Sequence, residues 1–173
     1  KPSWPIPKIF RLTKGGKLIA GVFEGETINT PSMLCTEDYL DALAWSESIG
    51  GLSALQARAD ANAKVLYSWA DKTPWLESLA ADPATRSNTS VCLKIVDPAV
   101  AQLPIEAQRG FVKQIESILD KENAARDIAG HRDAPPHLRI WCGSTVETAD
   151  LEALTGWLDW AFAEAKAGLV KAA

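Results

Sequence analysis

The sequence predicts an α+β domain in which helices cover one face of a small, mainly antiparallel sheet. Three observations predict this class. After a first helix, the chain is expected to run through helix, strand, helix, strand, strand and helix. The expected helices carry apolar residues at helical spacing, and the last expected strand alternates in its side chains with a period of two. The last two strands are separated by a proline-rich turn, which indicates a strand-turn-strand unit.

Length and charge limit the classes of function. The 173 residues, 47% of them hydrophobic, are enough for one domain with its own core. A net charge of −4 argues against a general affinity for nucleic acid or for anionic membranes, so any anion site must be local. No apolar run approaches the roughly 20 residues that span a bilayer. Cys35, Cys92 and Cys142 are far apart in apolar surroundings, which predicts buried, reduced thiols in a cytoplasmic protein.

The first 30 residues are expected to be mostly irregular. A proline-rich start leads to a Gly-Gly turn within Thr13–Lys17 and then to a short strand over Leu18–Phe23. The spacing of a phosphate-binding loop is absent around this Gly-Gly-Lys, so a plain hairpin turn is the better interpretation. The chain begins at Lys1 without a methionine and resembles no signal peptide, so we expect it to be part of a longer polypeptide.

The run Asn29-Thr30-Pro31-Ser32 predicts the start of the first helix. Thr30 is expected as the N-cap and Pro31 as the first helical residue, and Gly50-Gly51 should end the helix. A helix N-terminus with Asn and Thr side chains could hold an anion, although most such caps only cap.

The remaining elements follow from periodicity and from their end signals. They are a helix over Leu52–Lys72, a strand over Thr89–Val96, a helix over Pro104–Glu122, a short strand over Arg126–Ala129, a strand over Leu138–Cys142 and a last helix after Thr148. The seven tryptophans mostly occupy helical-face positions, so we expect them to pack in the core.

The stretch from Gly130 to Trp141 holds both histidines of the chain and two arginines within nine residues. Because Pro135 and Pro136 belong in a connection, His131, Arg132 and Arg139 are expected to ring the mouth of a strand-turn-strand. Guanidinium forks there suit phosphate and carboxylate. A solvated turn with ordinary surface charge is the open alternative.

No catalytic motif is found in the sequence. It contains no Gly-x-Ser-x-Gly elbow, no His-Glu-x-x-His, no paired-cysteine metal motif and no dinucleotide fingerprint. Nothing supports His137 and Cys142 as a nucleophile pair. The sequence therefore offers anion-binding groups, but no catalytic residue and no metal ligand.

Four stretches resemble the C-terminal portion of the phosphoserine aminotransferase family, especially its bacterial branch, in which Pro-Lys-Ile-Phe-Arg precedes an Asn-Thr-Pro motif. They are Pro7–Lys17, Phe23–Leu34, Asp82–Ser90 and Gly130–Gly143.

The resemblance implies a homodimeric fold-type-I transaminase that uses pyridoxal 5'-phosphate. Such an enzyme interconverts phosphoserine and 2-oxoglutarate with 3-phosphohydroxypyruvate and glutamate in serine biosynthesis. Residues 1–30 would then be the tail end of the large cofactor-binding domain, 31–51 a connecting helix and 52–173 the C-terminal small domain.

The resemblance also implies roles for five residues. Asn29 and Thr30 would contact the cofactor phosphate of the neighbouring subunit. His131 and Arg132 would hold the substrate phosphate across the dimer, and Arg139 would bind the substrate α-carboxylate.

The Schiff-base lysine of the family lies upstream of every matched stretch, and Lys8, Lys14 and Lys17 are no substitutes for it. This segment alone is therefore expected to be inactive. Two alternatives stay open: a non-catalytic anion-binding or interaction domain derived from such an enzyme, and a related transaminase with a non-phosphorylated substrate.

Overall fold

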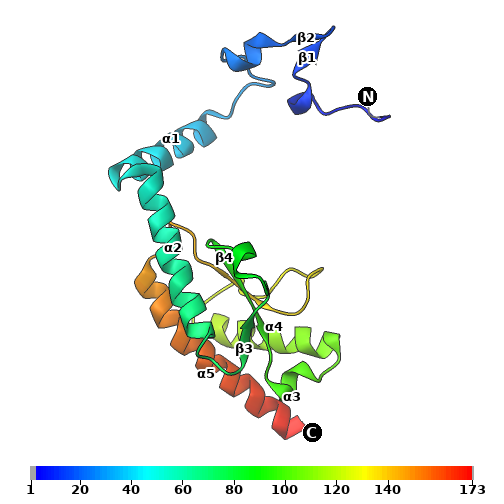
Figure 1. Cartoon of the computed structure of the whole chain (residues 1–173), viewed down its shortest axis with the longest axis vertical. Helices are drawn as coiled ribbons and strands as arrows, with labels where there is room; N and C mark the ends of the chain where they lie inside the picture. Colours follow the sequence, from blue (N-terminus) through cyan, green and yellow to red (C-terminus); the bar gives the residue numbers. More distant parts are fainter. Residues whose placement is uncertain (1–2, 173) are drawn as a thin grey trace. The chain divides into compact units, whose positions relative to one another are not determined.

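The structure is a computed structural model that describes the backbone of residues 3–172 and the side chains through Leu169 (Figure 1). Lys1 and Pro2, at the start of the expected 1–30 segment, and Ala173, at the end of the expected 52–173 domain, lie outside the described residues. The chain divides into two compact units, and the division falls between Ser48 and Ile49.

The first unit is built from short elements and one helix. These are the 3-10 helix η1 (Lys8–Phe10), strands β1 (Thr13–Lys14) and β2 (Lys17–Leu18), the 3-10 helix η2 (Ala20–Phe23) and helix α1 (Met33–Ser48). Gly15 and Gly16 have φ of 58° and 77°, so the expected Gly-Gly hairpin turn is confirmed. The strand expected over Leu18–Phe23 is wrong beyond Leu18. The Gly21 carbonyl accepts from the N–H groups of Glu24 and Glu26, at 3.0 and 2.8 Å, and these bonds close turns instead of a ladder.

The expected first helix exists, but it begins two residues later than the sequence predicts. Ser32, and not Thr30, is the N-cap: the Cys35 N–H donates to Ser32 Oγ at 3.4 Å, and the Thr36 N–H donates to the Ser32 carbonyl at 3.1 Å. Thr30 precedes a proline, which favours an extended backbone there, so the first residue free to cap is Ser32. Gly50, with φ of 110°, follows the end of the helix.

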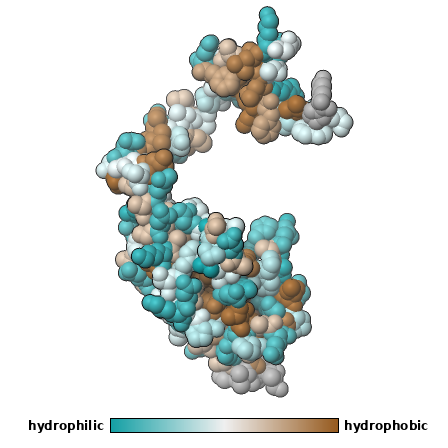
Figure 2. Space-filling view, in the orientation of Figure 1, coloured by the Kyte–Doolittle hydropathy of each residue, from teal (hydrophilic) through white to brown (hydrophobic). Residues whose placement is uncertain are grey.

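The first unit has no core of its own. None of the described side chains between residues 3 and 48 is buried, and Figure 2 shows apolar side chains at its surface. Its exposed large apolar residues include Phe10, Phe23, Leu34, Tyr39 and Leu40. Exposed apolar surface of this kind is often covered by another protein surface.

The second unit contains the main sheet and four helices of the described chain. Its elements are α2 (Gly51–Ala70), β3 (Leu76–Ser78), η3 (Pro83–Thr85), β4 (Ser90–Ile95), α3 (Pro98–Ala101), α4 (Ile105–Lys121), β5 (Leu138–Trp141) and α5 (Thr148–Ala172). Three expected helices and two expected strands are confirmed. The strand expected over Arg126–Ala129 is wrong: only an isolated bridge joins Ala129 to Leu138, because Asp127 has a φ of 53° and interrupts the extended backbone.

The sheet is antiparallel with strand order β3-β4-β5, which confirms the predicted fold class. Leu93 and Leu138 face each other on its inner surface and are fully buried. They join the core that α2, α4 and α5 supply, and α5 packs against both other helices (Figure 1). The side chains of this core include Leu66, Ile115, Leu119 and Leu158. Helices therefore cover one face of the sheet.

The alternation of β5 separates core from surface as predicted. Leu138 and Ile140 are buried, whereas Arg139 is half-buried and Trp141 is exposed. The expectation that the tryptophans pack mostly in the core is wrong, because among the described residues only Trp75 is buried; it stacks on Phe162 with ring centroids 4.1 Å apart. Trp4, Trp45, Trp141, Trp157 and Trp160 are exposed. Helical spacing gives the direction of a side chain but does not say which face meets the core.

Between residues 3 and 172, no helix combines the length and the apolar character needed to cross a membrane.

Candidate anion-binding site

The loop that follows β5 is fixed to helix α2 by one buried amide. Asn62 is fully buried, and its Nδ2 donates to the carbonyls of Gly143, at 3.1 Å, and Val146, at 2.9 Å. Its Oδ1 accepts from the Thr148 hydroxyl at 2.7 Å. One turn earlier, Arg58 donates to the Ser144 carbonyl at 2.8 Å. Asn62 therefore fixes the end of β5 and the start of α5 together.

The hairpin that carries the basic residues is closed by main-chain bonds. The Gly130 N–H donates to the His137 carbonyl at 2.9 Å, and the Arg139 N–H donates to the Ile128 carbonyl at 2.7 Å. The intervening loop turns at His131, whose carbonyl accepts from the Ala134 N–H at 3.0 Å. The segment ahead of the loop thus pairs with the free edge of β5.

His137 anchors this hairpin through its buried imidazole ring. The residue is buried, and its Nδ1 lies 2.6 Å from the Pro135 carbonyl, which can only accept, so Nδ1 carries the proton. Gly130 lies directly against the imidazole ring, since a Cβ at this position would overlap three of its atoms. The glycine that precedes the expected site residues is therefore required by close packing.

Arg139 lies on β5 opposite Cys92 of β4. Its Nη2 donates to Asp127 Oδ2 at 3.1 Å, so a carboxylate of the chain itself contacts the guanidinium. The side chain lines a cavity of about 600 Å³ whose other walls include Ser90, Trp141 and Leu151. A strand-held guanidinium beside a mainly apolar cavity suits a small carboxylate.

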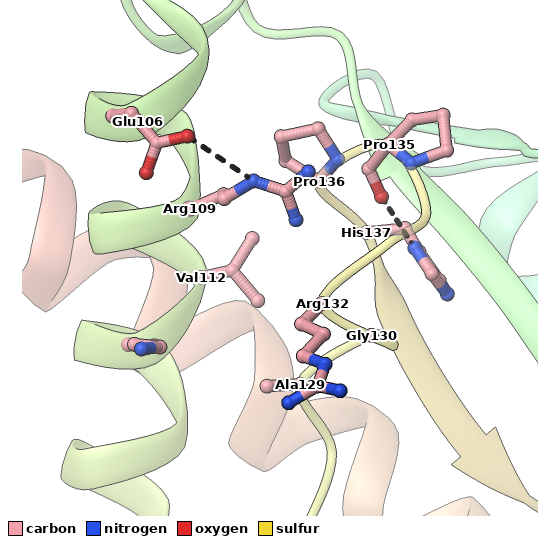
Figure 3. A pocket seen from close by; sticks show the side chains of 10 residues that line it. Glu106, Arg109, Val112, Ala129, Gly130, Arg132, Pro135, Pro136 and His137 are labelled. Atoms are coloured by element: carbon pink, nitrogen blue, oxygen red, sulfur yellow. Dashed lines mark hydrogen bonds and ion pairs between the residues drawn. The ribbon is translucent and has the colours of Figure 1, made fainter.

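Arg132 lines a different cavity, of about 360 Å³, between α4 and the hairpin (Figure 3). Arg109, Lys113, Pro135 and Pro136 also line it. The structure thus does not gather the predicted residues around one mouth: Arg132 and Arg139 line two separate cavities.

His131 lines neither of these two cavities. Its Nδ1 accepts from the Asp133 N–H at 3.2 Å, which leaves the proton of the neutral ring on Nε2. Asp133 Oδ2 lies 3.7 Å from both His131 Nδ1 and Arg132 Nε. The side chains of His131 and Arg132 are 63% and 90% exposed, so both are free to meet a ligand or another protein surface.

Asn29 and Thr30 lie in the irregular stretch before α1, and both are exposed. In the part of the chain that the structure describes, neither side chain makes a hydrogen bond. An amide and a hydroxyl offer donors that fit a phosphate group, so these two residues are compatible with the phosphate of pyridoxal phosphate.

Sequence reasoning missed Arg109 and Lys113. The apolar residues of this stretch predicted α4 and its core face, and the basic residues were left unassigned. The available signal was their spacing of four residues, which places both on one side of a helix.

The three cysteines differ in exposure: Cys142 is buried, Cys92 half-buried and Cys35 exposed, so the expectation of buried thiols is wrong for Cys35. Burial raises the pKa of the Cys142 thiol and also the pKa of the Cys92 thiol. Among the described residues, no group of three or more His, Cys, Asp or Glu side chains is arranged to hold a metal ion.

Alkylation of the native chain at neutral pH should modify Cys35 first and Cys142 only upon unfolding, because the thiolate is the nucleophile and burial disfavours it. Mass spectrometry of the alkylated peptides measures this order. Since the folded pKa is raised, the unfolded thiol loses its proton first as the pH rises above about 8.5, and the free energy of unfolding falls there. A Cys142→Ala variant should show less of this fall. Equal labelling rates for Cys35 and Cys142 would contradict the prediction.

No family model matches the chain. By sequence it is 47% identical to a phosphoserine aminotransferase of Methanosarcina mazei and 50% identical to one of Methanosarcina barkeri, in each case over 161 residues. Both alignments cover 93% of this chain and 41% of the relative. A phosphoserine aminotransferase of a Nocardioides species is 29% identical over 155 residues, which are 90% of this chain and 38% of that relative.

Solved structures agree in fold. A phosphoserine aminotransferase from Bacillus circulans subsp. alkalophilus superposes with a TM-score of 0.67 at 19% identity, over 83% of this chain and 36% of that chain. The phosphoserine aminotransferase from Trichomonas vaginalis with bound pyridoxal phosphate gives a TM-score of 0.65 at 21% identity, over 80% of this chain and 36% of that chain. The chain spans about two fifths of the length of the Methanosarcina relatives. The chain is thus similar in sequence to a portion of the phosphoserine aminotransferases, and it shares the fold of that portion.

Proposed function

We propose that this chain is the C-terminal part of a phosphoserine aminotransferase that depends on pyridoxal phosphate. The complete enzyme would interconvert phosphoserine and 2-oxoglutarate with 3-phosphohydroxypyruvate and glutamate, in serine biosynthesis. The observation that carries the substrate class is the placement of Arg132 and Arg139 at two separate cavities of one hairpin. A substrate with a phosphate at one end and a carboxylate at the other needs two cationic groups at separate positions.

Arg139 is proposed to bind the substrate α-carboxylate. Its strand position limits its motion, and its guanidinium already donates to a carboxylate, that of Asp127. The substrate carboxylate would take the place of Asp127, whose side chain is 86% exposed and so can turn into solvent at small cost.

His131 and Arg132 are proposed to hold the substrate phosphate across a dimer. Both side chains are exposed, and His131 Nε2 carries a proton that it can donate. A phosphate with two negative charges gains more from the Arg132 guanidinium and the His131 N–H than a carboxylate of a non-phosphorylated amino acid does.

Asn29 and Thr30 are proposed to donate to the cofactor phosphate of the neighbouring subunit. When bound, pyridoxal phosphate would act as the electron sink that lets the substrate lose its α-proton. The exposed apolar residues of α1, among them Leu34 and Leu40, support a homodimer, because such side chains are normally covered in an assembly. We also propose that the enzyme is cytoplasmic, and its free cysteines support this.

The assignment is tested with Arg132→Ala in the full-length dimeric enzyme. The two half-reactions are measured separately, one with phosphoserine and one with glutamate. We expect kcat/KM for phosphoserine to fall about 10- to 100-fold, with little change for glutamate, because only phosphoserine loses a charged partner. Lys121→Ala, on the last turn of α4, is the control and should leave both values unchanged. Equal losses for the two substrates would show that Arg132 does not recognise phosphate, and would favour a substrate without phosphate.

A further inference from the structure

Two tryptophans of α5 lie at the protein surface, outside the core. Trp157 and Trp160 are 41% and 40% exposed, and neither packs against the buried core. Within the described chain, neither indole N–H donates a hydrogen bond. Trp69 and Trp75, in contrast, both donate to Asp159, each at 3.1 Å. Packing and internal hydrogen bonds therefore account for Trp69 and Trp75, but not for the two surface tryptophans.

The two surface indoles form two walls of a cavity. Their ring centroids are 5.5 Å apart, and their planes stand at 82° to each other. The cavity has a volume of about 560 Å³, and its remaining lining is Ala153, Gly156 and Glu122. Glu122 lies at the end of α4, which packs alongside α5 (Figure 1). A recess of this volume is large enough for a small molecule.

The aromatic and charged groups of this lining all favour a cation. The face of an indole ring carries negative potential and attracts cations more strongly than the other aromatic side chains do. Glu122 adds a carboxylate at the C-terminal end of α4, where the helix dipole is also negative. Among the described residues, the Glu122 carboxylate forms no ion pair and no hydrogen bond. No basic side chain that the structure describes lines the cavity, and Lys121, next to Glu122, is not part of it.

Gly156 keeps the cavity open between the indoles and α4. Glycine is unfavourable inside a helix, and Gly156 lies in the interior of α5 with a helical backbone. Close packing does not require it, because a Cβ at this position would meet no atom within 4 Å. A side chain here would instead occupy part of the cavity that Gly156 lines.

We propose that this cavity binds a small organic cation with an alkylated ammonium group. The two indole faces would contact its alkyl groups, and Glu122 would balance its charge. Alkyl groups spread the positive charge over apolar surface, which suits an aromatic corner better than a strongly hydrated metal ion does. The cavity shares no residue with the cavities beside Arg132 and Arg139, so this site lies beyond the proposed function.

NMR of the indole N–H groups tests the site in the full-length protein with isotope-labelled tryptophan. Trp157→Phe and Trp160→Phe identify the two resonances. Choline chloride should shift both with saturation in the millimolar range, because cation–π contacts at exposed sites are weak. Sodium chloride at the same concentration is the salt control. The neutral alcohol in which a quaternary carbon replaces the ammonium nitrogen has the same shape as choline, and it should bind at least about fivefold more weakly.

Two glycine variants test the shape of the cavity. Gly156→Leu should fill it and remove the choline response. Gly110→Leu is the matched control, because Gly110 also lies inside a helix, has no atom within 4 Å of a Cβ and does not line the cavity. It should bind choline as the wild type does. Leucine forms helix better than glycine, so both variants should unfold at or above the wild-type temperature.

Two acidic residues test the charge. Glu122→Gln should weaken choline binding about 3- to 10-fold, because it removes the carboxylate of the lining. Asp150→Asn removes a negative charge from the first turn of α5, outside the lining, and should leave the affinity unchanged.

Three results would each overturn the proposal: no saturable choline response in the folded wild type, equal affinity for choline and the neutral alcohol, or unchanged binding in both Gly156→Leu and Glu122→Gln. Equal affinity for the two ligands would mean that the cavity is only an apolar recess. If Gly156→Leu does not fold, the exposed Glu122 still decides the question. Because these titrations involve no turnover, their result is independent of the transamination proposed above.

Discussion

Replacing Asn62 with leucine should lower the free energy of unfolding by about 2–4 kcal/mol. Leucine keeps the branched shape and the number of heavy atoms of the side chain, while three polar partners lose their hydrogen bonds. Two of them are the carbonyls of Gly143 and Val146, which lie in the loop between β5 and α5. A buried carbonyl without a donor loses its hydrogen bonds to water and gains none in return. The free energy of this desolvation sets the size of the effect.

Urea denaturation followed by circular dichroism measures this loss, and two variants control it. Asn62→Asp keeps the shape but points carboxylate oxygen at two carbonyls, so it should destabilise at least as strongly as leucine at neutral pH. Asn88→Ala removes an exposed amide that donates to Asp60 at 2.7 Å, and it should cost under about 1 kcal/mol. If Asn62→Leu lowers the free energy of unfolding no more than Asn88→Ala does, the loop carbonyls must accept hydrogen bonds from water in the variant.

The elements that the sequence predicts correctly are those with a long periodic signal or a clear stop. Helix α4 carries apolar residues at helical spacing throughout, and β5 alternates strictly. Strand β3 was missed because it is only three residues long. Such a strand exists because β4 offers it a partner: Leu76 pairs with Ile95, and Ser78 pairs with Leu93. Local sequence contains no trace of that pairing.

The candidate site was predictable in part. Two arginines and two histidines in nine residues mark the hairpin, and the prolines mark its turn. The separation of Arg132 from Arg139 was not predictable, because it depends on which cavity each side chain lines in the folded protein. The cavity beside Arg132 needs residues from α4 that lie 19 to 26 positions earlier in the chain, and only tertiary packing brings these together.

Replacing Arg139 with alanine in the full-length dimer should lower kcat/KM about 100- to 1,000-fold for phosphoserine and for glutamate alike. Both substrates carry an α-carboxylate, to which a guanidinium fork donates two parallel bonds. The other guanidinium of the lining, that of Arg126, is already held by Asp120 at 3.1 Å and by Asn123 at 3.0 Å. Arg139→Lys keeps the charge but loses the fork, so it should recover only part of the activity. Kinetics of the two half-reactions measure these losses.

Stability separates this effect from a general loss of structure. In the described chain, the ion-pair partner of Arg139 is Asp127, which is largely exposed, and pairs of this kind contribute about 0–1 kcal/mol. The alanine variant should therefore unfold at nearly the wild-type urea concentration while it loses most of its activity. Lys94 lies on the adjacent strand and forms a half-exposed ion pair with Glu77. Lys94→Ala should change neither the stability nor the activity. If Arg139→Ala spared glutamate and impaired only phosphoserine, Arg139 would be the phosphate ligand. The roles of the two arginines would then be exchanged, because each lies at its own cavity and the substrate could bind in the opposite direction.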